Sequence, residues 1–574
     1  MTDIAAPSNI DHANRAGSSR GLLRFVPQLP LLAWLAILVV LPNLLLLGVS
    51  FLRSNNGVII YELTLENYVR AWQSSGVWVL LGRTLMTAAL SALIAAAIAY
   101  PMAYYAARVL QKGRFVALIL VIIPLWISLL MRVFAWRVIL GENGVLNAFL
   151  LRMGIISEPS DALLYNSFAV FLTFVYVSIP FIFVAVYAAI ERIPQSLVDA
   201  ASDCGANGMR AFATVIWPLS LSGMAIGVAL AFLMAVGDYV TPSMVGGLNG
   251  TMLGMVIASQ FGIVGNWPYG ATLALILLIS VAVILSILFR FARVPGVLVG
   301  EGGSGVALRN PPKTTSERLR RVAAFALFCL PYLFLYAPLI IIAIFSFNDS
   351  TVQIFPLTGF TFKWYREVLD NAALLAALNR SLYVGLLVLL ISIVAGTGFA
   401  ILLAYGKVVG SRITEQLLTL PVAIPGVVLG ITLVLTFQLL SLPTGIPRIV
   451  LGHCTFVMPV IMLTVLSRLR RLDPALVEAS SDLGARYSST IWNVILPLVR
   501  GSIIGGALLG FTLSVDEVVV SLFLTGTQPT LPVWVWNQMR FGFTPSVNAI
   551  FVCIGVFSIV LTVVARRFLQ PEKN

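Results

Sequence analysis

Long apolar stretches, separated by short polar segments, run through almost the whole chain. Each stretch is about 20 residues or longer, which is the length that an α-helix needs to cross the hydrocarbon core of a bilayer. The pattern predicts an all-α polytopic membrane protein with about twelve transmembrane helices, six in each half. They lie at about 29–51, 78–106, 114–140, 166–190, 219–245 and 269–291, and then at about 322–346, 374–405, 412–440, 449–467, 498–525 and 546–567.

The composition excludes a water-soluble globular protein. Of the 574 residues 59% are apolar and 10% are charged, whereas average soluble domains have about 45–50% and about 25%. The formal net charge of +13 does not call for nucleic acid as a partner, because membrane proteins gather Lys and Arg in their cytoplasmic loops. Most basic residues fall in every second loop, and the predicted external loop 246–268 has no charge. We therefore expect membrane lipid around the chain and both termini in the cytoplasm.

A segment without apolar periodicity, rich in Gly and containing Pro and Arg, divides the chain near its middle. It predicts a cytoplasmic linker between two six-helix halves. The expected division is a cytoplasmic tail at 1–28, a first half at 29–291, the linker at 292–321, a second half at 322–567 and a tail at 568–574.

The two halves form an internal repeat. Residues early in each half match at an offset of 297, and later residues match at an offset of 279. Because each half crosses the membrane an even number of times, the halves are predicted to be parallel repeats related by an axis along the membrane normal. The matching sets are Tyr68, Arg83 and Thr84 with Tyr365, Arg380 and Ser381, and Pro180, Gly205, Pro218, Phe232 and Gly247 with Pro459, Gly484, Pro497, Phe511 and Gly526.

Between the fourth and fifth predicted helices of each half, at about 191–218 and 470–497, a cytoplasmic stretch carries the same pattern. Its small Ala and Ser side chains let another protein approach closely, and its two acids, four residues apart, share one helix face. The glycine permits a sharp bend, and the following proline suits the first turn of the next helix. The residues of the pattern are Asp199, Ala200, Ala201, Asp203 and Gly205 in the first copy, and Glu478, Ala479, Asp482 and Gly484 in the second.

These stretches resemble the EAA loops of ABC-importer permeases, whose pattern is EAA, three residues, Gly, nine residues and I-x-L-P. The chain departs from it with Asp199 for Glu, Ser480 for the second Ala, and Val in both copies for the Ile. A single match would fit an interfacial helix equally well, but two copies in the same topological place favour docking. The resemblance implies a type I ABC-importer permease fold, with two permeases that are usually separate fused in one chain.

The same resemblance implies that the chain is not an enzyme and works with two copies of an ATP-binding cassette subunit, which bind ATP and Mg. The only Gly-Lys dipeptide, Gly406-Lys407, lacks the frame of a nucleotide-binding loop. The two histidines, His12 and His453, are too far apart for a histidine-based metal site, and the four cysteines form no CxxC pair. No cofactor or metal site is expected in this chain.

Segments around the loops resemble the permeases of spermidine/putrescine importers. Residues 123–132 and 237–247 resemble the first permease, and 511–517 with 540–545 resemble the second, although Glu517 replaces one of its usual two aspartates. The resemblance implies import of a polyamine or a similar small cationic solute across the bacterial inner membrane, with a periplasmic or extracellular solute-binding protein. Importers for ferric iron, thiamine, aminoalkylphosphonates and opines share the wider architecture and stay as alternatives.

Three acids are predicted near the far ends of the fifth helices. Asp238 and Glu517 are repeat equivalents, each 20 residues after the proline of its loop, and Asp516 is adjacent. At 1.5 Å a residue they lie about 30 Å along their helices. An acid in a membrane helix is a functional hypothesis by default, so we expect the three to line a path for a cation. The alternative is that they cap helix ends at the external interface.

Tryptophans and arginines in or beside the apolar stretches are further candidates. Trp126 and Trp534, like Trp136 and Trp536, could offer cation–π faces to an ammonium group, but tryptophan is also enriched at membrane interfaces. Arg132 lies about 27 Å up the third helix if that helix is straight. We expect Arg132 to extend to the outer interface and to face away from a cation path.

Two classes of function therefore remain after the sequence analysis. The first is the fused permease of an ATP-driven importer that works by alternating access. The second is an ion-coupled secondary transporter, which also fits twelve helices in two parallel halves but makes no use of the paired loops. A membrane enzyme is third, because the sequence shows no constellation of nucleophile, base and metal.

Overall fold

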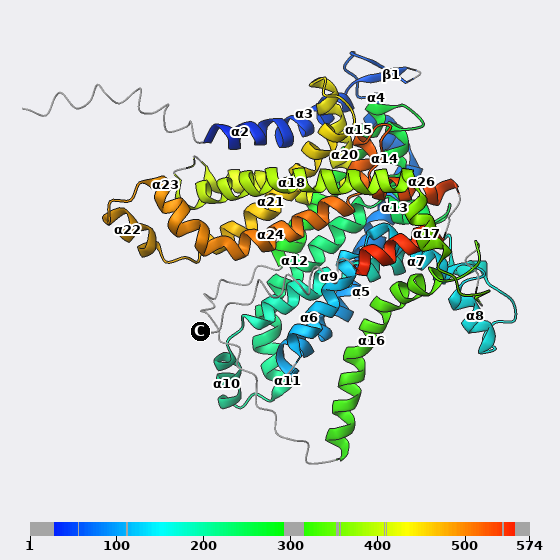
Figure 1. The fold of residues 1–574 in the computed structure, drawn as a ribbon, viewed down its shortest axis with the longest axis horizontal. Helices are drawn as coiled ribbons and strands as arrows, with labels where there is room; N and C mark the ends of the chain where they lie inside the picture. Colours follow the sequence, from blue (N-terminus) through cyan, green and yellow to red (C-terminus); the bar gives the residue numbers. More distant parts are fainter. Residues whose placement is uncertain are drawn as a thin grey trace, which may run out of the picture. The chain divides into compact units, whose positions relative to one another are not determined.

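The computed structural model describes residues 28–55, 57–110, 113–291, 315–351, 355, 357–406, 408, 410–541 and 545–556. In these residues the secondary structure is almost entirely helical (Figure 1). One hairpin, β1 (Arg53–Asn55) with β2 (Val58–Ile60), pairs antiparallel with Arg53 opposite Ile60. Nine of the described helices are long and apolar enough to cross a membrane, or eleven if each of two bent pairs is one span. The predicted all-α polytopic class is confirmed.

The elements follow the repeat that the sequence predicts. Those of the first half are α2 (Leu29–Leu35), η2 (Ala36–Val40), α3 (Leu41–Ser50), α4 (Glu66–Gln73), α5 (Ser75–Tyr104), η3 (Tyr105–Val109), α6 (Arg114–Ile122), η4 (Ile123–Trp126), α7 (Leu129–Leu140), α8 (Val145–Arg152), η5 (Asp161–Leu163), α9 (Ser167–Glu191), α10 (Gln195–Asp203), α11 (Gly208–Ala211), η6 (Phe212–Ile216), α12 (Trp217–Gly237), α13 (Val240–Val245), α14 (Leu253–Phe261) and α15 (Trp267–Phe291).

The second half repeats this order. Its elements are α16 (Thr315–Phe345), α17 (Lys363–Asp370), α18 (Ala372–Tyr405), α19 (Ser411–Ala423), α20 (Gly426–Leu439), α21 (Ile446–Leu469), α22 (Pro474–Asp482), α23 (Tyr487–Thr490), η7 (Ile491–Ile495), α24 (Leu496–Asp516), α25 (Val519–Leu524) and α26 (Leu531–Phe541). The last predicted span begins with the helix Ser546–Val556. The rest of that span, both tails and the linker up to residue 314 lie outside the described residues.

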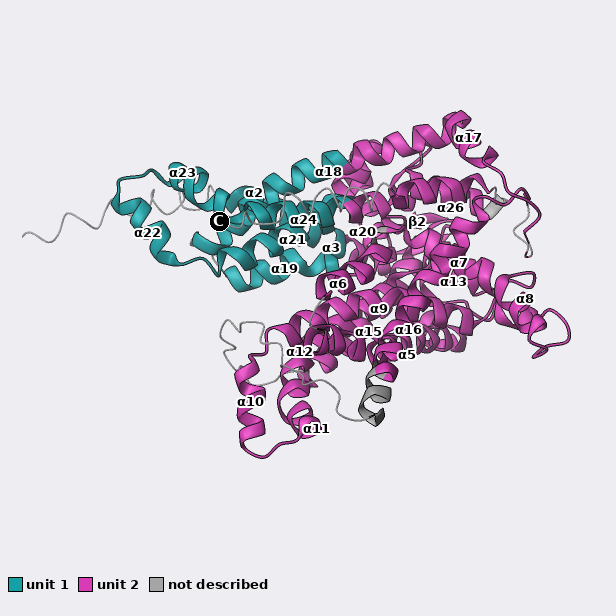
Figure 2. Cartoon of the chain, turned by 60° about the horizontal axis from the view of Figure 1, so that its bottom comes forward, with its two compact units in different colours: residues 1–44, 386–422, 453–511 teal, residues 45–385, 423–452, 512–574 magenta. Residues whose placement is uncertain are grey.

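The chain forms two compact units (Figure 2). Unit 1 comprises residues 1–44, 386–422 and 453–511, and unit 2 comprises residues 45–385, 423–452 and 512–574. These units do not coincide with the two sequence halves, because unit 2 holds most of the first half together with segments of the second. All three candidate acids lie in unit 2.

The third span of each half is broken, which the sequence analysis did not predict. The pair α6 and α7 bends by 86°, and the pair α19 and α20 bends by 108°. The breaks lie at residues 126–128 and 424–425. Pro425 stands in the second break and Pro124 shortly before the first, where the missing backbone N–H and the pyrrolidine ring disfavour a continuous helix. The predicted continuous helices at 114–140 and 412–440 are therefore wrong in this respect.

The fifth spans differ from the prediction at both ends. They begin at Gly208 and Tyr487 rather than near residues 219 and 498. The π-helical turns η6 and η7 stand just before Pro218 and Pro497, and such a widened turn accommodates a proline inside a helix. The helices then stop at Gly237 and Asp516, so that each predicted span is in fact a long helix followed by the short α13 or α25.

The repeated early motif makes the same hydrogen bonds twice within unit 2. Thr84 Oγ1 accepts from the backbone N–H of Leu253 at 2.9 Å, at the start of α14. Ser381 Oγ accepts from that of Leu531 at 2.8 Å, at the start of α26. The preceding arginines, Arg83 and Arg380, donate to backbone carbonyls of the loops that lead into these helices. The internal repeat is thus confirmed at the level of individual bonds.

Small residues let α9 and α12 pack closely in unit 2. A Cβ added at Gly227 would lie 2.9 Å from Ile182 Cα, and one at Gly223 would lie 2.9 Å from the carbonyl oxygen of Ala185. Two membrane helices gain contact when small residues allow their backbones to approach. Gly82 on α5, in contrast, has no atom within 4 Å of such a Cβ.

We expect Gly227→Ala to lower the thermal stability of the purified chain, because the backbone of α9 would have to move to admit the methyl group. Overpacking of this kind costs about 1–3 kcal/mol. Gly82→Ala is the matched control and should leave the melting temperature unchanged or raise it. Equal melting behaviour of the two variants would contradict the close approach of α9 and α12.

Candidate functional site

The chain leaves the helix at the end of each fifth span and starts a short new helix, and an acid stands at each of these points. Asp238 has an extended backbone with φ −85° and ψ 115°. Its Oδ1 accepts hydrogen bonds from the N–H groups of Val240 at 2.7 Å and Thr241 at 3.1 Å, and its Oδ2 accepts one from the Thr241 hydroxyl. Asp238 therefore caps α13.

Glu517 does the same for α25. Its Oε1 accepts from the N–H of Val520 at 2.9 Å, and Val520 is the repeat equivalent of Thr241. Both acids therefore cap the short helices that follow them. The caps are nevertheless removed from water, because Asp238 is only 7% exposed and Glu517 is half-buried. A carboxylate that caps a helix can still interact with a cation, because each of its oxygens can accept more than one hydrogen bond.

Asp516 has a different partner from its neighbour. Its two carboxylate oxygens lie 3.3 and 3.1 Å from the backbone nitrogen of Leu129, which donates to both. Leu129 is the first residue of α7, directly after the break in the third span. Asp516 therefore caps a helix of the first half from the second half of the chain.

Arg132 corrects the expectation that it extends to the outer interface. Its side chain is buried, with 3% exposure, in the first turn of α7, the helix whose start Asp516 caps. The expectation assumed a straight third helix, whereas the 86° bend before α7 turns the residues after it back into the bundle. Arg137, on the same helix, is the arginine that is partly exposed, and it donates to the hydroxyl of Tyr165 at 3.2 Å.

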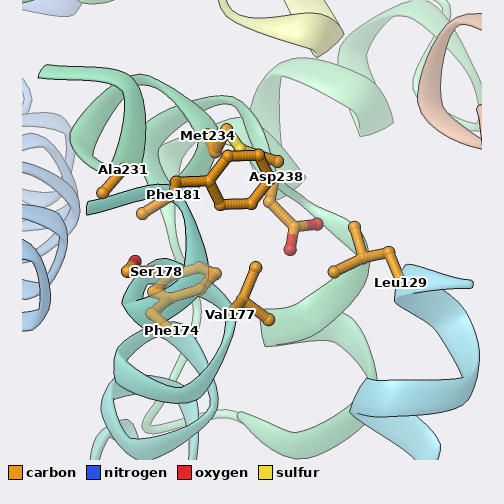
Figure 3. A pocket seen from close by; sticks show the side chains of 9 residues that line it. Leu129, Phe174, Val177, Ser178, Phe181, Ala231, Met234 and Asp238 are labelled. Carbon is orange, nitrogen blue, oxygen red and sulfur yellow. The ribbon is translucent and has the colours of Figure 1, made fainter. Parts of the chain in front are cut away.

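A small cavity lies at Asp238 (Figure 3). It has a volume of about 20 Å³, and Figure 3 shows the Asp238 carboxylate turned toward it with Leu129 opposite. A space of this size holds about one water molecule and no diamine. The structure therefore has this point closed. The lining residues are Leu129, Phe174, Val177, Ser178, Phe181, Ala231, Met234, Ala235 and Asp238.

The candidate tryptophans divide into different environments. Trp536 packs edge-on against Tyr239, next to Asp238, with ring centroids 6.1 Å apart. Trp534 is buried on the same helix, α26, and Trp136 packs against Tyr176 in a separate aromatic cluster. The side chain of Trp126 lies outside the described part of the structure. Trp536, rather than Trp534, thus contacts the ring next to Asp238 in the chain, and Phe174 and Phe181 line the cavity itself.

The two predicted docking stretches form short helices, α10 in unit 2 and α22 in unit 1. Neither α10 nor α22 has a buried residue, so their acids and small side chains are open to another protein. Both helices are followed by a glycine in the left-handed region, Gly205 with φ +84° and Gly484 with φ +78°.

Both glycines close the same Schellman motif, in which two backbone bonds satisfy the last carbonyls of the helix. The predicted sharp bend at each glycine is confirmed, in two copies with the same bonds. These are Gly205 N to Ser202 O at 2.9 Å and Ala206 N to Ala201 O at 3.0 Å, and Gly484 N to Ser481 O at 2.9 Å and Ala485 N to Ser480 O at 3.1 Å.

Sequence reasoning missed the residues that hold each docking helix in place. Arg108, at the end of the second span, donates to Gln195 Oε1 at 3.1 Å, and Gln195 donates to Asp199 Oδ1 at 3.0 Å. In the second copy the hydroxyls of Ser480 and Thr490 are hydrogen-bonded at 2.9 Å. The departure of Ser480 from the expected alanine was the one sequence signal for such a contact.

The comparison with known families agrees with this geometry. Residues 99–298 and again residues 396–570 match the model of the family described as "Binding-protein-dependent transport system inner membrane component". The chain belongs to this family. Since the model matches twice, two members that are usually separate are fused in this chain.

Individual relatives match about half of the chain each. "Spermidine/putrescine transport system permease protein PotB" of Haemophilus influenzae is 34% identical over 262 residues, which are 45% of this chain and 90% of that protein. PotC of Escherichia coli, with the corresponding description, is 34% identical over 244 residues, 42% of this chain and 92% of that protein. The predicted resemblance to permeases of this type is confirmed, and these relatives are transport permeases rather than enzymes.

We expect Gly205→Ala to loosen the end of α10, because a non-glycine residue in the left-handed region costs about 1–2 kcal/mol. Amide hydrogen exchange at residues 204–206 should become roughly tenfold faster, as 1.4 kcal/mol corresponds to a factor of ten. Gly484→Ala should have the same effect at residues 483–485.

The matched control is Gly208→Ala, since Gly208 has ordinary backbone angles and no atom within 4 Å of an added Cβ. Exchange that is equally slow in all three variants would show that the left-handed conformation does not hold these loops.

Proposed function

We propose that this chain is the membrane-spanning permease of an ATP-driven importer and carries a polyamine or a similar small cationic solute inward. The observation that carries the proposal is the pair of docking helices. α10 and α22 come from different halves, have no buried residue, and end in the same glycine-closed cap. A repeat that keeps an exposed helix and its cap in both copies indicates a repeated partner.

The partner in this proposal is an ATP-binding cassette subunit present twice, one copy on each docking helix. ATP and Mg are held by those subunits. A solute-binding protein delivers the substrate from the outside, in keeping with the description of the family. The chain is a multi-pass protein of the bacterial inner membrane, and both its termini are cytoplasmic, as the distribution of basic residues indicates.

The acids support a cationic substrate. Asp238 and Glu517 occupy equivalent places in the two repeats, and each is a carboxylate in a largely apolar setting. Such a charge costs about 2.5–3.5 kcal/mol at the centre of a membrane helix, and an ammonium group offsets that cost. The descriptions of the PotB and PotC relatives name spermidine and putrescine, which carry two or more ammonium groups.

Transport in this proposal works by alternating access. The conformational changes that accompany ATP binding and hydrolysis in the partner subunits are transmitted to the membrane helices through α10 and α22. The closed point at Asp238, with room for about one water molecule, opens toward one side of the membrane and then toward the other. The chain itself performs no covalent chemistry.

Reconstitution tests this function directly. The full chain, its ATP-binding subunit and its binding protein are placed in proteoliposomes, and uptake of radiolabelled putrescine and spermidine is measured. We expect uptake that requires the binding protein and also requires ATP on the side of the membrane that carries the ATP-binding subunit. Uptake driven by a proton or sodium gradient without ATP would overturn the proposal in favour of an ion-coupled transporter.

In the same assay we expect Asp238→Asn and Glu517→Gln each to lower polyamine uptake about tenfold or more. The amides keep an oxygen that can accept the capping bonds of α13 and α25, so the loss reports the charge. Asp161→Asn, an exposed acid outside the membrane part, is the control and should transport at the wild-type rate. Wild-type rates for both amide variants would show that the acids serve only as caps.

A further inference from the structure

The two repeats build the same junction in two different ways. α7 begins at Leu129 and α20 at Gly426, which are equivalent at the offset of 297. The residues before them, Ser128 and Pro425, have nearly the same backbone angles, φ −44° with ψ 137° and φ −53° with ψ 133°. The residues that end the fifth spans, Gly237 and Asp516, are equivalent at the offset of 279.

Each fifth span ends against the broken third span of the other half. At one junction the backbones touch, because a Cβ added at Gly237 would lie 2.7 Å from Gly426 N and 3.0 Å from Pro425 Cα. At the other junction the Asp516 carboxylate accepts from the N–H of Leu129. A glycine thus allows close backbone contact at one junction, and at the other an aspartate accepts a hydrogen bond from the start of the helix.

A second substitution accompanies the first. Arg132 is the repeat equivalent of Leu429, and both side chains are buried, at 3% and 4% exposure. The junction that has the aspartate also has the arginine, whereas the junction that has the glycine has a leucine. Asp516 and Arg132 are therefore an added pair of opposite charge that breaks the symmetry of the repeat.

The arginine is not engaged elsewhere in the part of the chain that the structure describes. Its Nε is buried there without a hydrogen-bond partner. Arg132 follows Leu129 by about one turn on the same face of α7, and helical side chains lean toward the N-terminus, where the Asp516 carboxylate accepts from Leu129. A buried guanidinium needs a compensating charge, and the Asp516 carboxylate lies at this end of the helix.

We propose that Arg132 and Asp516 form a charge latch that keeps the path closed at the α7 junction, with Arg132 as the resident counter-cation that an ammonium group of the substrate displaces. This inference rests on the proposed function. It divides the three acids into two roles. Asp238 and Glu517, the symmetric pair, keep their charge available for substrate, and Asp516 is a positioning residue that acts on α7.

The latch predicts how variants of Arg132 and Asp516 differ in stability, and the equivalent residues of the other junction show which substitutions to make. Arg132→Leu and Asp516→Gly each leave one charge without its partner, and the double variant reproduces the Leu429 and Gly237 of the other junction. We expect both single variants of the purified full chain to melt at a lower temperature than the double variant. A double variant that is no more stable than the weaker single variant overturns the latch. If a single variant fails to fold, the test still applies, and the measured result is whether the double variant recovers folding.

Asp516→Asn separates the charge from the hydrogen bond, since the amide oxygen still accepts from Leu129. In the reconstituted complex we expect Asp516→Asn and Arg132→Leu to raise ATP hydrolysis in the absence of the binding protein by about tenfold, because a looser junction opens without substrate. The double variant with Asp516→Asn and Arg132→Leu should hydrolyse ATP at the same rate as either single variant. Arg132→Lys keeps the positive charge and should retain the low basal rate of ATP hydrolysis of the wild type. Arg137→Leu, on the same helix but outside the latch, should not change it.

Basal rates that stay at the wild-type level, or effects of the two variants that multiply, would overturn the inference. The melting experiment needs neither ATP nor substrate. A failure of the proposed function, seen as absent ATP-driven uptake by the wild-type complex, is therefore distinguishable from a failure of the latch.

Discussion

Backbone N–H groups at the start of a buried helix need an acceptor, and this requirement organises the part of unit 2 in which the third and fifth spans break. The chain breaks its third and fifth spans, and each break exposes such groups. Asp238, Glu517 and Asp516 supply acceptors for α13, α25 and α7. The residues that make broken helices possible are thus the same residues that place negative charge on the proposed path.

Broken helices suit this region to the change of shape that the proposed transport cycle requires. A continuous helix fixes the direction of the chain, whereas the bends of 86° and 108° create short segments whose ends meet other segments. Where α7 meets Asp516, the contact is one carboxylate and one N–H rather than an interdigitated core. Such a contact can be exchanged for another of similar strength, as the proposed displacement of Arg132 by an ammonium group requires.

Duplication explains why the two halves agree in some features and differ in others. The docking helices keep the same cap, and the early motif keeps the same bonds to α14 and α26. These features contact elements of the fold that are repeated or, in the proposed function, a partner that is present twice. The proposed substrate path has no such duplicate, so the junctions at its sides are free to diverge. The pair of Arg132 and Asp516 against Leu429 and Gly237 is the clearest case.

The sequence by itself determined the class of protein, the approximate positions of most spans, the repeat and the two glycine-capped helices that we propose for docking. Each of these depends on apolar runs or on short motifs whose geometry is local, such as a glycine that ends a helix. The acids could also be selected, because a charge in an apolar run is conspicuous. The sequence did not determine what these acids contact. Leu129 and Asp516 are 387 residues apart, and Arg132 was misplaced because its position depended on a bend in the third span. Only the tertiary structure decided those contacts, since helix direction after a break is set by packing against segments that are distant in the chain.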